Sequence, residues 1–571
     1  MLDAYAARSC PVKTHNAFDP FVEQPAVPDD ESLRESFQGG RAYRELVLDR
    51  LAAGDSAVDL RAMEPRQGEA ETLRALAQGA RVVVAPRLPR DAVGGRSGQP
   101  DALVRDADSP DAHPGYWPLK VKPYRVTEKE TGSTQLLSSP VDDIGRRSTL
   151  PGLRFRAYRE GVLLELAHYW RMLESLGYAA AAPWGCVVGQ SRNAEADPRG
   201  TWLLLTTKFL RTFSRTAGYK LRSALERYDH EFKFRLHVAE SASQRRPGDT
   251  SPPVVRPIRV KECEWCPWWQ VCLPKMDRDD LSLRISKAPL DVRELQTLAG
   301  LGIHTVSHLA AADVEEILPH YLPLTTHRDR SEQRLRQAAR RARMLADNVA
   351  LERISTEPIG VPRAPVEVDL DIETSEEGLV YLWGALVSFR GEQPRYVQFS
   401  RFEPLGPAEE LSLAEEFAAW FAELCAEHPD VLVYHYSDYE TVHLRRLASR
   451  SSRPALQETV DLIPDHFVDL FRFTRENFVG VDGLGLKVVA TEGAGFRWRD
   501  EEPGGLASIM WFTQAVTDED PTVREAARVR VLQYNEDDVR ATLALREWFD
   551  RLDAGTQQRA DQERASTFTA R

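Results

Sequence analysis

The sequence predicts a multidomain α/β protein, and three observations support this prediction. The chain has 571 residues, of which 42% are hydrophobic and 28% charged, an ordinary globular composition that suffices for two or three cores. A cysteine near the start, Cys10, is followed far along the chain by Cys263, Cys266 and Cys272. Residues 361–553 contain β-rich runs first and then alternating helical and β-rich runs, which indicates a mixed sheet.

The four cysteines have a spacing that suits a metal cofactor joining the two ends of one domain. Four thiolates can bind an iron–sulfur cluster, and one distant cysteine plus C-x2-C-x5-C favours a cluster over the two close pairs of a zinc ribbon. Zinc remains the alternative metal, and unligated buried thiols are the third possibility. The other two cysteines, Cys186 and Cys425, have no companion at ligand spacing, and we predict that both are buried.

This cysteine pattern resembles the iron–sulfur-containing RecB-type nucleases, including the AddB nuclease domain and the CRISPR-associated Cas exonucleases. The resemblance implies a PD-(D/E)xK nuclease domain, of the restriction-endonuclease-like fold, over residues 1–275. It also implies a 4Fe-4S cluster on Cys10, Cys263, Cys266 and Cys272. The chain has no G-x-x-x-x-G-K-[ST] loop of an ATP-driven motor, so any unwinding of a duplex would need a separate helicase.

The first domain is predicted to contain loops around short strands. Residues 88–114 and 127–151 are rich in Gly, Pro, Ser and Asp, and we predict strands at 102–104 and 116–121. Residues 159–177 have helical apolar spacing and end at a glycine, as helices often do.

Five residues between the cysteines resemble a PD-(D/E)xK core. They are Glu45, Asp101, Lys122, Glu165 and Tyr169. Two residues depart from the family pattern, because Lys120 stands where an acid is expected and Glu165 stands where a glutamine is expected. A cation at the position of a metal ligand removes that ligand and repels Mg²⁺. The alternatives are therefore an active first nuclease site and a nucleic-acid-binding fold without one.

Residues 276–353 are predicted to form a helical linker. The segment 295–310 reads as helix, Gly-containing turn and helix, which resembles a helix-hairpin-helix. Backbone N–H groups of such a turn can bind a phosphate without reading bases. A plain helical connector in which Gly302 ends the helix is the alternative.

The net charge of −13 is unusual for a protein that binds nucleic acid, because phosphate contacts usually come from a basic surface. Local basic segments could supply these contacts. The candidates are Arg211, Arg215, Lys220, Arg222 and Arg227 in one segment, and Arg334, Arg340, Arg341 and Arg343 in another. Each is equally consistent with a solvated helix face.

A second set of candidate site residues lies in residues 361–553. Asp371 and Glu373 end a predicted strand, whose two-residue repeat places both on one face. Such a pair repels unless a cation lies between the carboxylates. Asp369 lies two residues earlier on the same face, and a salt-bridged strand end is the alternative for any one of these three acids. Tyr534 and Asp538 lie four residues apart in a predicted helix and therefore on one side of it. The alternative for the acids there is a favourable interaction with the helix dipole.

Together these motifs resemble the DEDD exonucleases of the RNase H-like superfamily, particularly the YprB-like branch with a tyrosine in the last motif. The resemblance spans about residues 366–550. It implies catalytic roles for Asp371, Glu373, Glu440, Tyr534 and Asp538. Glu440 stands where the family has aspartate, with Asp438 as the fallback, and Asp469 and Lys487 match positions that support the site or meet a phosphate.

These residue types predict metal-dependent phosphodiester hydrolysis. Carboxylates that hold two divalent ions about 3.5–4 Å apart can activate a water and stabilise the leaving 3′ oxygen. Oxygen ligands select Mg²⁺ or Mn²⁺, and Tyr534 would orient the water, because a phenol is a poor base at neutral pH. The resemblance implies a 3′-to-5′ exonuclease acting on DNA, or on RNA, in repair or nucleic-acid processing. The alternative is a catalytically silent nucleic-acid-binding scaffold that recruits other factors.

The remaining predictions concern location and the end of the chain. No stretch approaches the roughly 18 consecutive apolar residues of a membrane helix, and the start lacks a signal-peptide pattern. Six cysteines in so long a chain do not suggest disulfides, and cluster thiolates need a reducing compartment. We therefore expect a cytoplasmic protein without membrane contact. Residues 555–571 are polar and are predicted to form a flexible tail.

Overall fold

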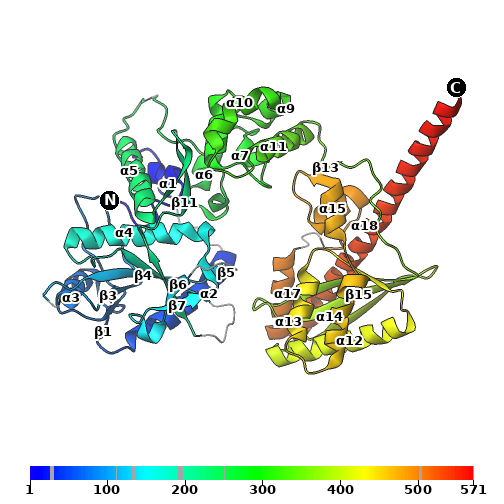
Figure 1. Ribbon diagram of the computed structural model, residues 1–571, viewed down its shortest axis with the longest axis horizontal. Helices are drawn as coiled ribbons and strands as arrows, with labels where there is room; N and C mark the ends of the chain where they lie inside the picture. Colours follow the sequence, from blue (N-terminus) through cyan, green and yellow to red (C-terminus); the bar gives the residue numbers. More distant parts are fainter. Residues whose placement is uncertain are drawn as a thin grey trace. The chain divides into compact units, whose positions relative to one another are not determined.

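The computed structural model describes residues 1–25, 31–110, 112–130, 135–190, 197–214, 216–249, 251–500 and 504–569. Two compact units are present (Figure 1). The first comprises Met1–Arg284, Leu290–Thr305 and Asp313–Leu335, and the second comprises Ile285–Pro289, Val306–Ala312 and Arg336–Arg571. The segment 276–353, expected to be a separate linker, is thus divided between the two units.

An eight-stranded mixed sheet forms the centre of the first unit, in the order β1-β2-β3-β4-β9-β10-β6-β7. The pairs β1–β2 and β4–β9 are parallel, and the other neighbours are antiparallel. The strands are β1 Ala57–Asp59, β2 Val82–Val84, β3 Ala102–Arg105, β4 Tyr116–Lys122, β6 Gln135–Pro140, β7 Ser148–Pro151, β9 Trp184–Gly189 and β10 Arg199–Leu204. The predicted strands at 102–104 and 116–121 are confirmed as β3 and β4. Part of the segment 127–151, for which loops were predicted, instead forms the paired strands β6 and β7.

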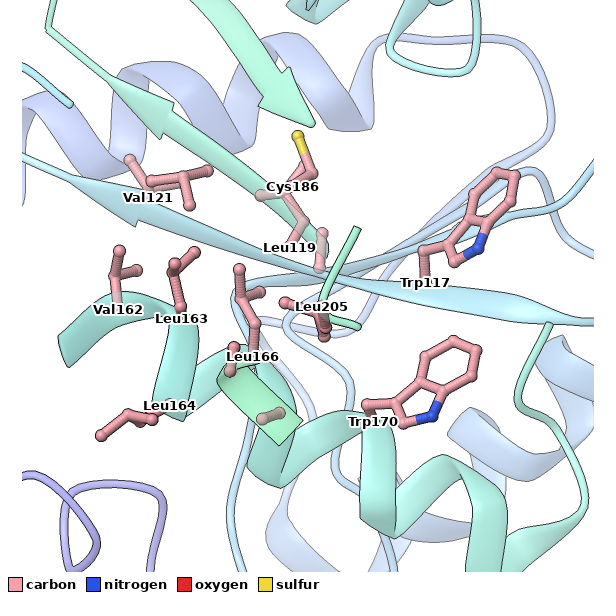
Figure 2. Packing of buried hydrophobic residues seen from close by; sticks show 14 of the residues in the cluster. Trp117, Leu119, Val121, Val162, Leu163, Leu164, Leu166, Trp170, Cys186 and Leu205 are labelled. Atoms are coloured by element: carbon pink, nitrogen blue, oxygen red, sulfur yellow. The ribbon is translucent and has the colours of Figure 1, made fainter. Parts of the chain in front are cut away.

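Helix α4 (Glu160–Leu176) packs against this sheet, and Gly177 ends it in the left-handed conformation with φ 76°, as the sequence predicted. Figure 2 shows Val162, Leu163 and Leu166 of α4 next to the strand that carries Leu119 and Val121. Burial of each such side chain stabilises the fold by about 1.5–3 kcal/mol. The same packing fixes the position of the polar residues that lie between these apolar ones on α4 and β4.

Short helices follow the first sheet. The predicted order of helix, glycine turn and helix is confirmed, because α8 (Val292–Gly300) is followed by Gly302 with φ 82° and then by α9 (Val306–Ala311). Helices α10 (Val314–Thr325) and α11 (Ser331–Ala346) complete this segment.

A five-stranded sheet forms the centre of the second unit, in the order β16-β15-β14-β17-β18. Strands β16, β15 and β14 are antiparallel, whereas β17 and β18 continue parallel to β14. The strands are β14 Val366–Thr374, β15 Val380–Phe389, β16 Arg395–Ser400, β17 Leu432–His435 and β18 Phe467–Asp469. The predicted mixed sheet is confirmed, and β14, β15 and β17 correspond to its three predicted strands.

Helices cover both faces of the second sheet. On one face, Phe417 of α12 (Pro407–Glu427) stacks on Trp383 with ring centres 4.8 Å apart. On the other face, α17 (Gly505–Thr517) and α18 (Pro521–Thr569) pack against β14. Helix α18 includes most of the segment that was expected to be a flexible tail. Within the part of the chain that the structure describes, no helix is both long and apolar enough to cross a membrane.

Candidate functional site

Strand β14 and helix α18 bring acidic residues from distant parts of the chain together. Residues 538 and 546 are two helical turns apart, about 12 Å, which matches the roughly 13 Å spanned by four strand residues. Arg546 accordingly bonds Asp369 at 2.8 and 3.0 Å near one end of β14. Asp538 lies beside Asp371 and Glu373 near the other end. The salt-bridged alternative considered for the strand therefore describes Asp369, and a separate acidic group remains.

We call Asp371, Glu373 and Asp538 the C-terminal acidic cluster. One potential ligand atom from each residue lies within 4.8 Å of the others, and both Glu373 and Asp538 are buried. Burial, and for Glu373 also the charge of Asp538, raises the pKa of Glu373 to about 8 and that of Asp538 to about 6. Burial and repulsion from the other two acids raise the pKa of Asp371 well above its usual value. A nearby cation would reverse these shifts.

Each carboxylate of this cluster also accepts a hydrogen bond from an uncharged side chain. The pairs are Asn535 Nδ2 with Asp371 at 2.7 Å, Ser508 Oγ with Glu373 at 2.6 Å and Trp498 Nε1 with Asp538 at 2.7 Å. Sequence reasoning missed all three donors. Asn535 lies inside the predicted last motif, whereas nothing in the local sequence around Ser508 or Trp498 connects them to the acids.

Tyr534 lies one turn before Asp538 on the same side of α18, as predicted. Burial and the neighbouring carboxylates raise the pKa of Tyr534 far above its usual value, so the phenol keeps its proton at neutral pH. Lys487 Nζ donates to the Tyr534 hydroxyl at 2.5 Å and lies 4.5 Å from the ring centre. The charge of Asp538 is one cause of the raised pKa of Tyr534.

Glu440 is buried near the cluster, whereas the fallback residue Asp438 is exposed. Burial raises the pKa of Glu440, and its charge contributes to the raised pKa of Asp371. Its Oε2 atom is buried without a hydrogen-bond partner, and His435 Nδ1 lies 3.6 Å away. Asp469 accepts the N–H of Ser437 at 2.9 Å and so holds the turn that precedes Glu440.

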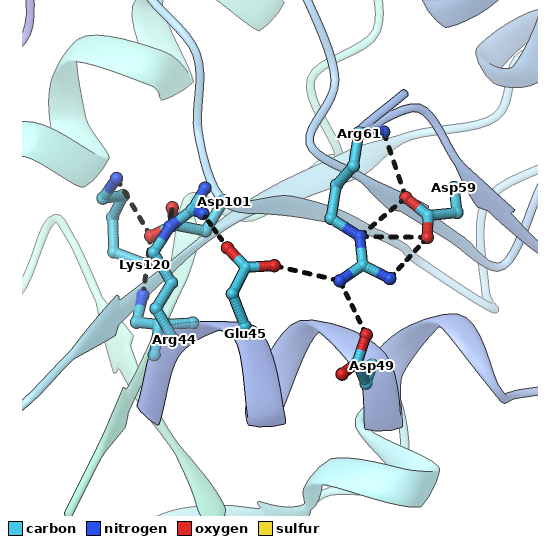
Figure 3. Close-up of polar contacts among 8 residues, drawn as sticks. Arg44, Glu45, Asp49, Asp59, Arg61, Asp101 and Lys120 are labelled. Atoms are coloured by element: carbon cyan, nitrogen blue, oxygen red, sulfur yellow. Dashed lines mark hydrogen bonds and ion pairs between the residues drawn. The ribbon is translucent and has the colours of Figure 1, made fainter. Parts of the chain in front are cut away.

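Acids near α4 have a different environment, and we call Asp101 and Glu165 the N-terminal acidic cluster. Asp101 contacts Lys120 Nζ at 2.9 Å and Arg44 Nε at 2.8 Å, and it accepts the N–H of Val121 at 2.8 Å (Figure 3). Burial alone would raise the pKa of Asp101, but Lys120 and Arg44 outweigh burial and lower it. The lysine that departs from the family pattern thus occupies the side of Asp101 where a metal ion was expected.

Glu165 likewise has two cationic partners. Lys122 Nζ lies 2.8 Å from it and Arg8 lies 2.9 Å from it, and the glutamate side chain is fully buried. Tyr169, one turn further along α4, has its ring centre 5.8 Å from Lys120 Nζ. The two carboxylates of this cluster therefore have four cationic partners, which leaves no excess negative charge for a divalent ion.

Glu45 belongs to a surface network next to this cluster. It contacts Arg44 at 2.9 Å and Arg61 at 3.0 Å, and Arg61 also bonds Asp49 and Asp59 (Figure 3). The structure thus brings all five predicted PD-(D/E)xK residues into one region while pairing each of their acids with cations.

At least four residues of the predicted basic segments have ion-pair partners within the fold. Their ion pairs are Arg211 with Asp329, Arg227 with Glu160 at 2.7 Å, Arg334 with Glu294 at 2.7 Å and Arg340 with Glu352 at 2.8 Å. Arg215 lies outside the described residues. These pairs favour a structural role for the arginines that form them.

The four cysteines proposed as ligands line one pocket. They are Cys10, Cys263, Cys266 and Cys272. The sulfur of Cys272 accepts a hydrogen bond from Asn16 at 3.6 Å, and that of Cys263 accepts the N–H of Val260 at 3.4 Å. Among the described residues, no three of these sulfurs lie within 4.8 Å of one another. Burial raises the pKa of Cys10 to about 11.

The remaining two cysteines differ in exposure. Cys186 is buried as predicted, whereas Cys425 is partly exposed. Cys425 lies at the side of α12, where its neighbours cover it incompletely, so its expected full burial is corrected.

Comparison with known proteins identifies one part of the chain. Residues 368–550 match the family model of the RNase H superfamily. No curated protein and no solved structure gives a significant match to the chain. The second unit therefore contains an RNase H-like domain whose acidic cluster is of the kind found in metal-dependent nucleases.

Proposed function

We propose that this protein is a divalent-metal-dependent exonuclease that removes nucleotides from 3′ ends of DNA, or of RNA, at the C-terminal acidic cluster. The observation that carries this proposal is the convergence of Asp371, Glu373 and Asp538, whose ligand atoms lie within 4.8 Å of one another. Three carboxylates at this spacing repel one another, and a divalent cation is the group that relieves the repulsion. The 3′-to-5′ polarity rests on the resemblance to DEDD exonucleases alone.

The residues present suit Mg²⁺ or Mn²⁺, because all three candidate ligands are carboxylate oxygens. When bound, such ions activate a water and stabilise the leaving oxygen of a phosphodiester. Glu440 supports this assignment as a further candidate ligand, since its Oε2 atom is buried and has no hydrogen-bond partner. A buried carboxylate oxygen without a hydrogen bond is costly unless a cation or an ordered water reaches it, and protonated His435, 3.6 Å away, would compete with a metal ion for this oxygen.

Tyr534 would position the attacking water. Its raised pKa keeps the phenol protonated, so it acts by hydrogen bonding and not as a base. Lys487 donates a hydrogen bond to the same hydroxyl and so fixes the orientation of the O–H group. In the hydrolysis, the water oxygen bonds to phosphorus and the bond from phosphorus to the 3′ oxygen breaks. One proton of the water passes through solvent to that 3′ oxygen, and a nucleoside monophosphate leaves.

The first unit would bind nucleic acid without cleaving it. Its two cluster carboxylates have four cationic partners, among them Lys120 at the side of Asp101 where a metal would bind. Any duplex unwinding would require a separate ATP-driven helicase, because the chain has no phosphate-binding motor loop.

We further propose that the cysteine pocket holds a 4Fe-4S cluster. All four cysteines line one pocket, and the side-chain amide of Asn16 and the backbone N–H of Val260 donate to the sulfurs of Cys272 and Cys263. Tetrahedral zinc with bonds of about 2.3 Å would draw the sulfurs to roughly 3.8 Å from one another. A 4Fe-4S cluster binds each of four cysteines through a different iron atom, and one distant cysteine together with C-x2-C-x5-C favours it over zinc.

The nuclease proposal is tested with end-labelled single- and double-stranded DNA and RNA, incubated with Mn²⁺ or with a chelator. We expect shortening from the 3′ end only with metal, and its loss in the Asp371→Asn/Asp538→Asn variant. Asp197→Asn, at the exposed ion pair of Asp197 with Arg50 in the first unit, is the matched control. Equal activity in the double variant and the unaltered protein would favour the nucleic-acid-binding scaffold.

The cluster proposal is tested on anaerobically purified protein. We expect brown protein with absorbance near 400 nm and about four iron atoms per chain, which corresponds to one cluster. The Cys263→Ser variant should lose the colour and the iron. Zinc in stoichiometric amount without colour would contradict it.

A further inference from the structure

Each acid of the C-terminal acidic cluster has one oxygen occupied by a hydrogen bond from an uncharged donor. The bonds run from Asn535 to Asp371, from Ser508 to Glu373 and from Trp498 to Asp538, at 2.6–2.7 Å. The donors come from helix α18, helix α17 and the segment between α16 (Leu486–Val489) and α17. A carboxylate held through one oxygen presents the other in a fixed direction.

We infer that Asn535, Ser508 and Trp498 are positioning residues that orient the three carboxylates toward one shared divalent cation. This inference rests on the proposed function, because it assumes that the cluster binds the metal. Residues that hydrogen-bond metal ligands typically contribute 10- to 100-fold in metal affinity. The geometry assigns that contribution here to Asn535, inside the last motif, and to Ser508 and Trp498, which lie outside every recognised motif.

The absence of charge on these donors is essential to the inference. Lysine or arginine at the same positions would orient the acids equally well but would cancel the negative charge that attracts a cation. The N-terminal acidic cluster shows this outcome, since Lys120 and Lys122 contact Asp101 and Glu165 directly. Amide, hydroxyl and indole donors supply direction while leaving the charge of the carboxylates in place.

Asn535 is itself fixed by its surroundings. The Tyr396 hydroxyl donates to its Oδ1 at 2.7 Å, which turns the amide nitrogen toward Asp371. Gly384 lies opposite Asp371 in the sheet, and a Cβ atom there would meet Asn535 Oδ1 at 1.6 Å. Only glycine at this position leaves room for the amide.

Trp498 is held equally firmly. The next residue, Arg499, bonds Asp537 through its backbone N–H at 2.9 Å and its Nε at 2.8 Å. The Phe496 ring lies edge-on to the indole with ring centres 4.9 Å apart. These contacts hold the segment against α18. The indole N–H therefore bonds Asp538 with little further loss of side-chain conformational entropy.

Ser508 completes the set from the buried side of α17. Its carbonyl oxygen accepts a hydrogen bond from Tyr381 at 3.4 Å, and Tyr381 stacks on Phe512 with ring centres 3.8 Å apart. The serine is 1% exposed, so water cannot replace its hydroxyl as the donor to Glu373.

The test measures Mn²⁺ affinity of the full chain by calorimetry and by electron paramagnetic resonance, without nucleic acid. Trp498→Phe keeps the ring but removes the donor, and Ser508→Ala removes the second donor. The matched control is Thr542→Val, because Thr542 bonds the backbone carbonyl of Asp538 at 3.0 Å and not its carboxylate. We expect each donor variant to weaken Mn²⁺ binding by about 10- to 100-fold, and the control by less than about threefold.

Thermal unfolding of the same variants checks that each one folds. Unchanged Mn²⁺ affinity in both donor variants would overturn the inference while leaving the proposed function intact. An equal loss in Thr542→Val would overturn it as well, because the effect would then be one of helix stability. Failure of the unaltered protein to bind Mn²⁺ would overturn the proposed function and this inference together.

Discussion

Both acidic clusters consist of Asp and Glu carboxylates, but the side chains that contact these carboxylates are cationic in one cluster and uncharged in the other. In the first unit, Asp101 and Glu165 each contact two cationic side chains at 2.8–2.9 Å. In the second, Asp371, Glu373 and Asp538 accept hydrogen bonds from an amide, a hydroxyl and an indole. The pKa of Asp101 is lowered as a result, whereas those of the second cluster are raised.

The comparison teaches that the charge of the donors, and not the number of acids, decides what a buried carboxylate can bind. Carboxylates that are neutralised by lysines need no cation from solution, and their ion pairs stabilise the fold. In a cluster whose hydrogen bonds come from neutral donors, the carboxylates hold protons more tightly than usual, and a divalent cation from solution can displace these protons.

The largest expected effect is the loss of stability on removing an N-terminal acid. Asp101→Asn leaves Lys120 buried beside an uncharged group, and breaking a buried pair in this way costs about 3–5 kcal/mol. Urea unfolding measures the change. The control is Asp142→Asn at the exposed pair with Arg50, where we expect at most about 1 kcal/mol. Equal losses of stability in Asp101→Asn and Asp142→Asn would contradict the conclusion that the buried ion pairs of the N-terminal acidic cluster stabilise the fold.

The second prediction concerns pH. The folded pKa of Glu373 is about 8, above its ordinary value near 4.3, so the folded protein holds the proton more tightly than the unfolded chain. Stability without metal should therefore fall by on the order of 3 kcal/mol between pH 5 and 8. Asp101 has a lowered pKa, so its contribution is complete above about pH 4 and adds no slope there.

Urea unfolding at several pH values, with chelator and with Mg²⁺, checks this slope. Glu373→Gln should flatten it, and Mg²⁺ should reduce it in the unaltered protein. A slope that Glu373→Gln leaves unchanged would assign the pH dependence to other groups.

The third prediction is a gain in the free energy of unfolding, whereas the first is a loss. Asp538→Asn removes a buried charge that also raises the pKa of Asp371 and Glu373. The pKa of Asp538, raised to about 6 chiefly by burial, corresponds to a stabilisation of about 3 kcal/mol at neutral pH without metal. The same variant should gain nothing from added Mn²⁺. Thermal unfolding with and without Mn²⁺ measures both effects, and destabilisation of the metal-free variant would contradict the account.

The smallest expected effect is that of a single methyl group. Gly384→Ala would displace Asn535 from Asp371 and weaken Mn²⁺ binding by about tenfold, or 1.4 kcal/mol. Gly391→Ala, at an open turn with positive φ, is the control for a general cost of replacing glycine. Equal Mn²⁺ affinity in Gly384→Ala and the unaltered protein would show that Asn535 is not required.

Much of the second unit could be predicted from sequence because its signals are local. The two-residue repeat placed Asp371 and Glu373 on one face, and the four-residue repeat placed Tyr534 with Asp538. Strand β18 is too short to show a pattern, and β16 has exposed and polar positions that hide its alternation. Spacing also could not show that Trp498 meets Asp538, because that contact depends on how a loop packs against α18.

Prediction was weaker for the first unit. The sequence located Lys120 as a departure from the expected motif, but it could not show that Arg8 and Arg44 approach from other segments. The four cysteines line one pocket, although no contact in the described structure identifies a cofactor there.

Mn²⁺ binding by the full-length Asp371→Asn/Asp538→Asn variant tests the central claim most directly. The N-terminal acidic cluster is intact in this variant, so calorimetry reports whether its acids can bind a divalent ion. The account predicts saturable binding in the unaltered protein and none in the variant. Undiminished saturable binding in the variant would show that the C-terminal acidic cluster is not the metal site, and would contradict the account.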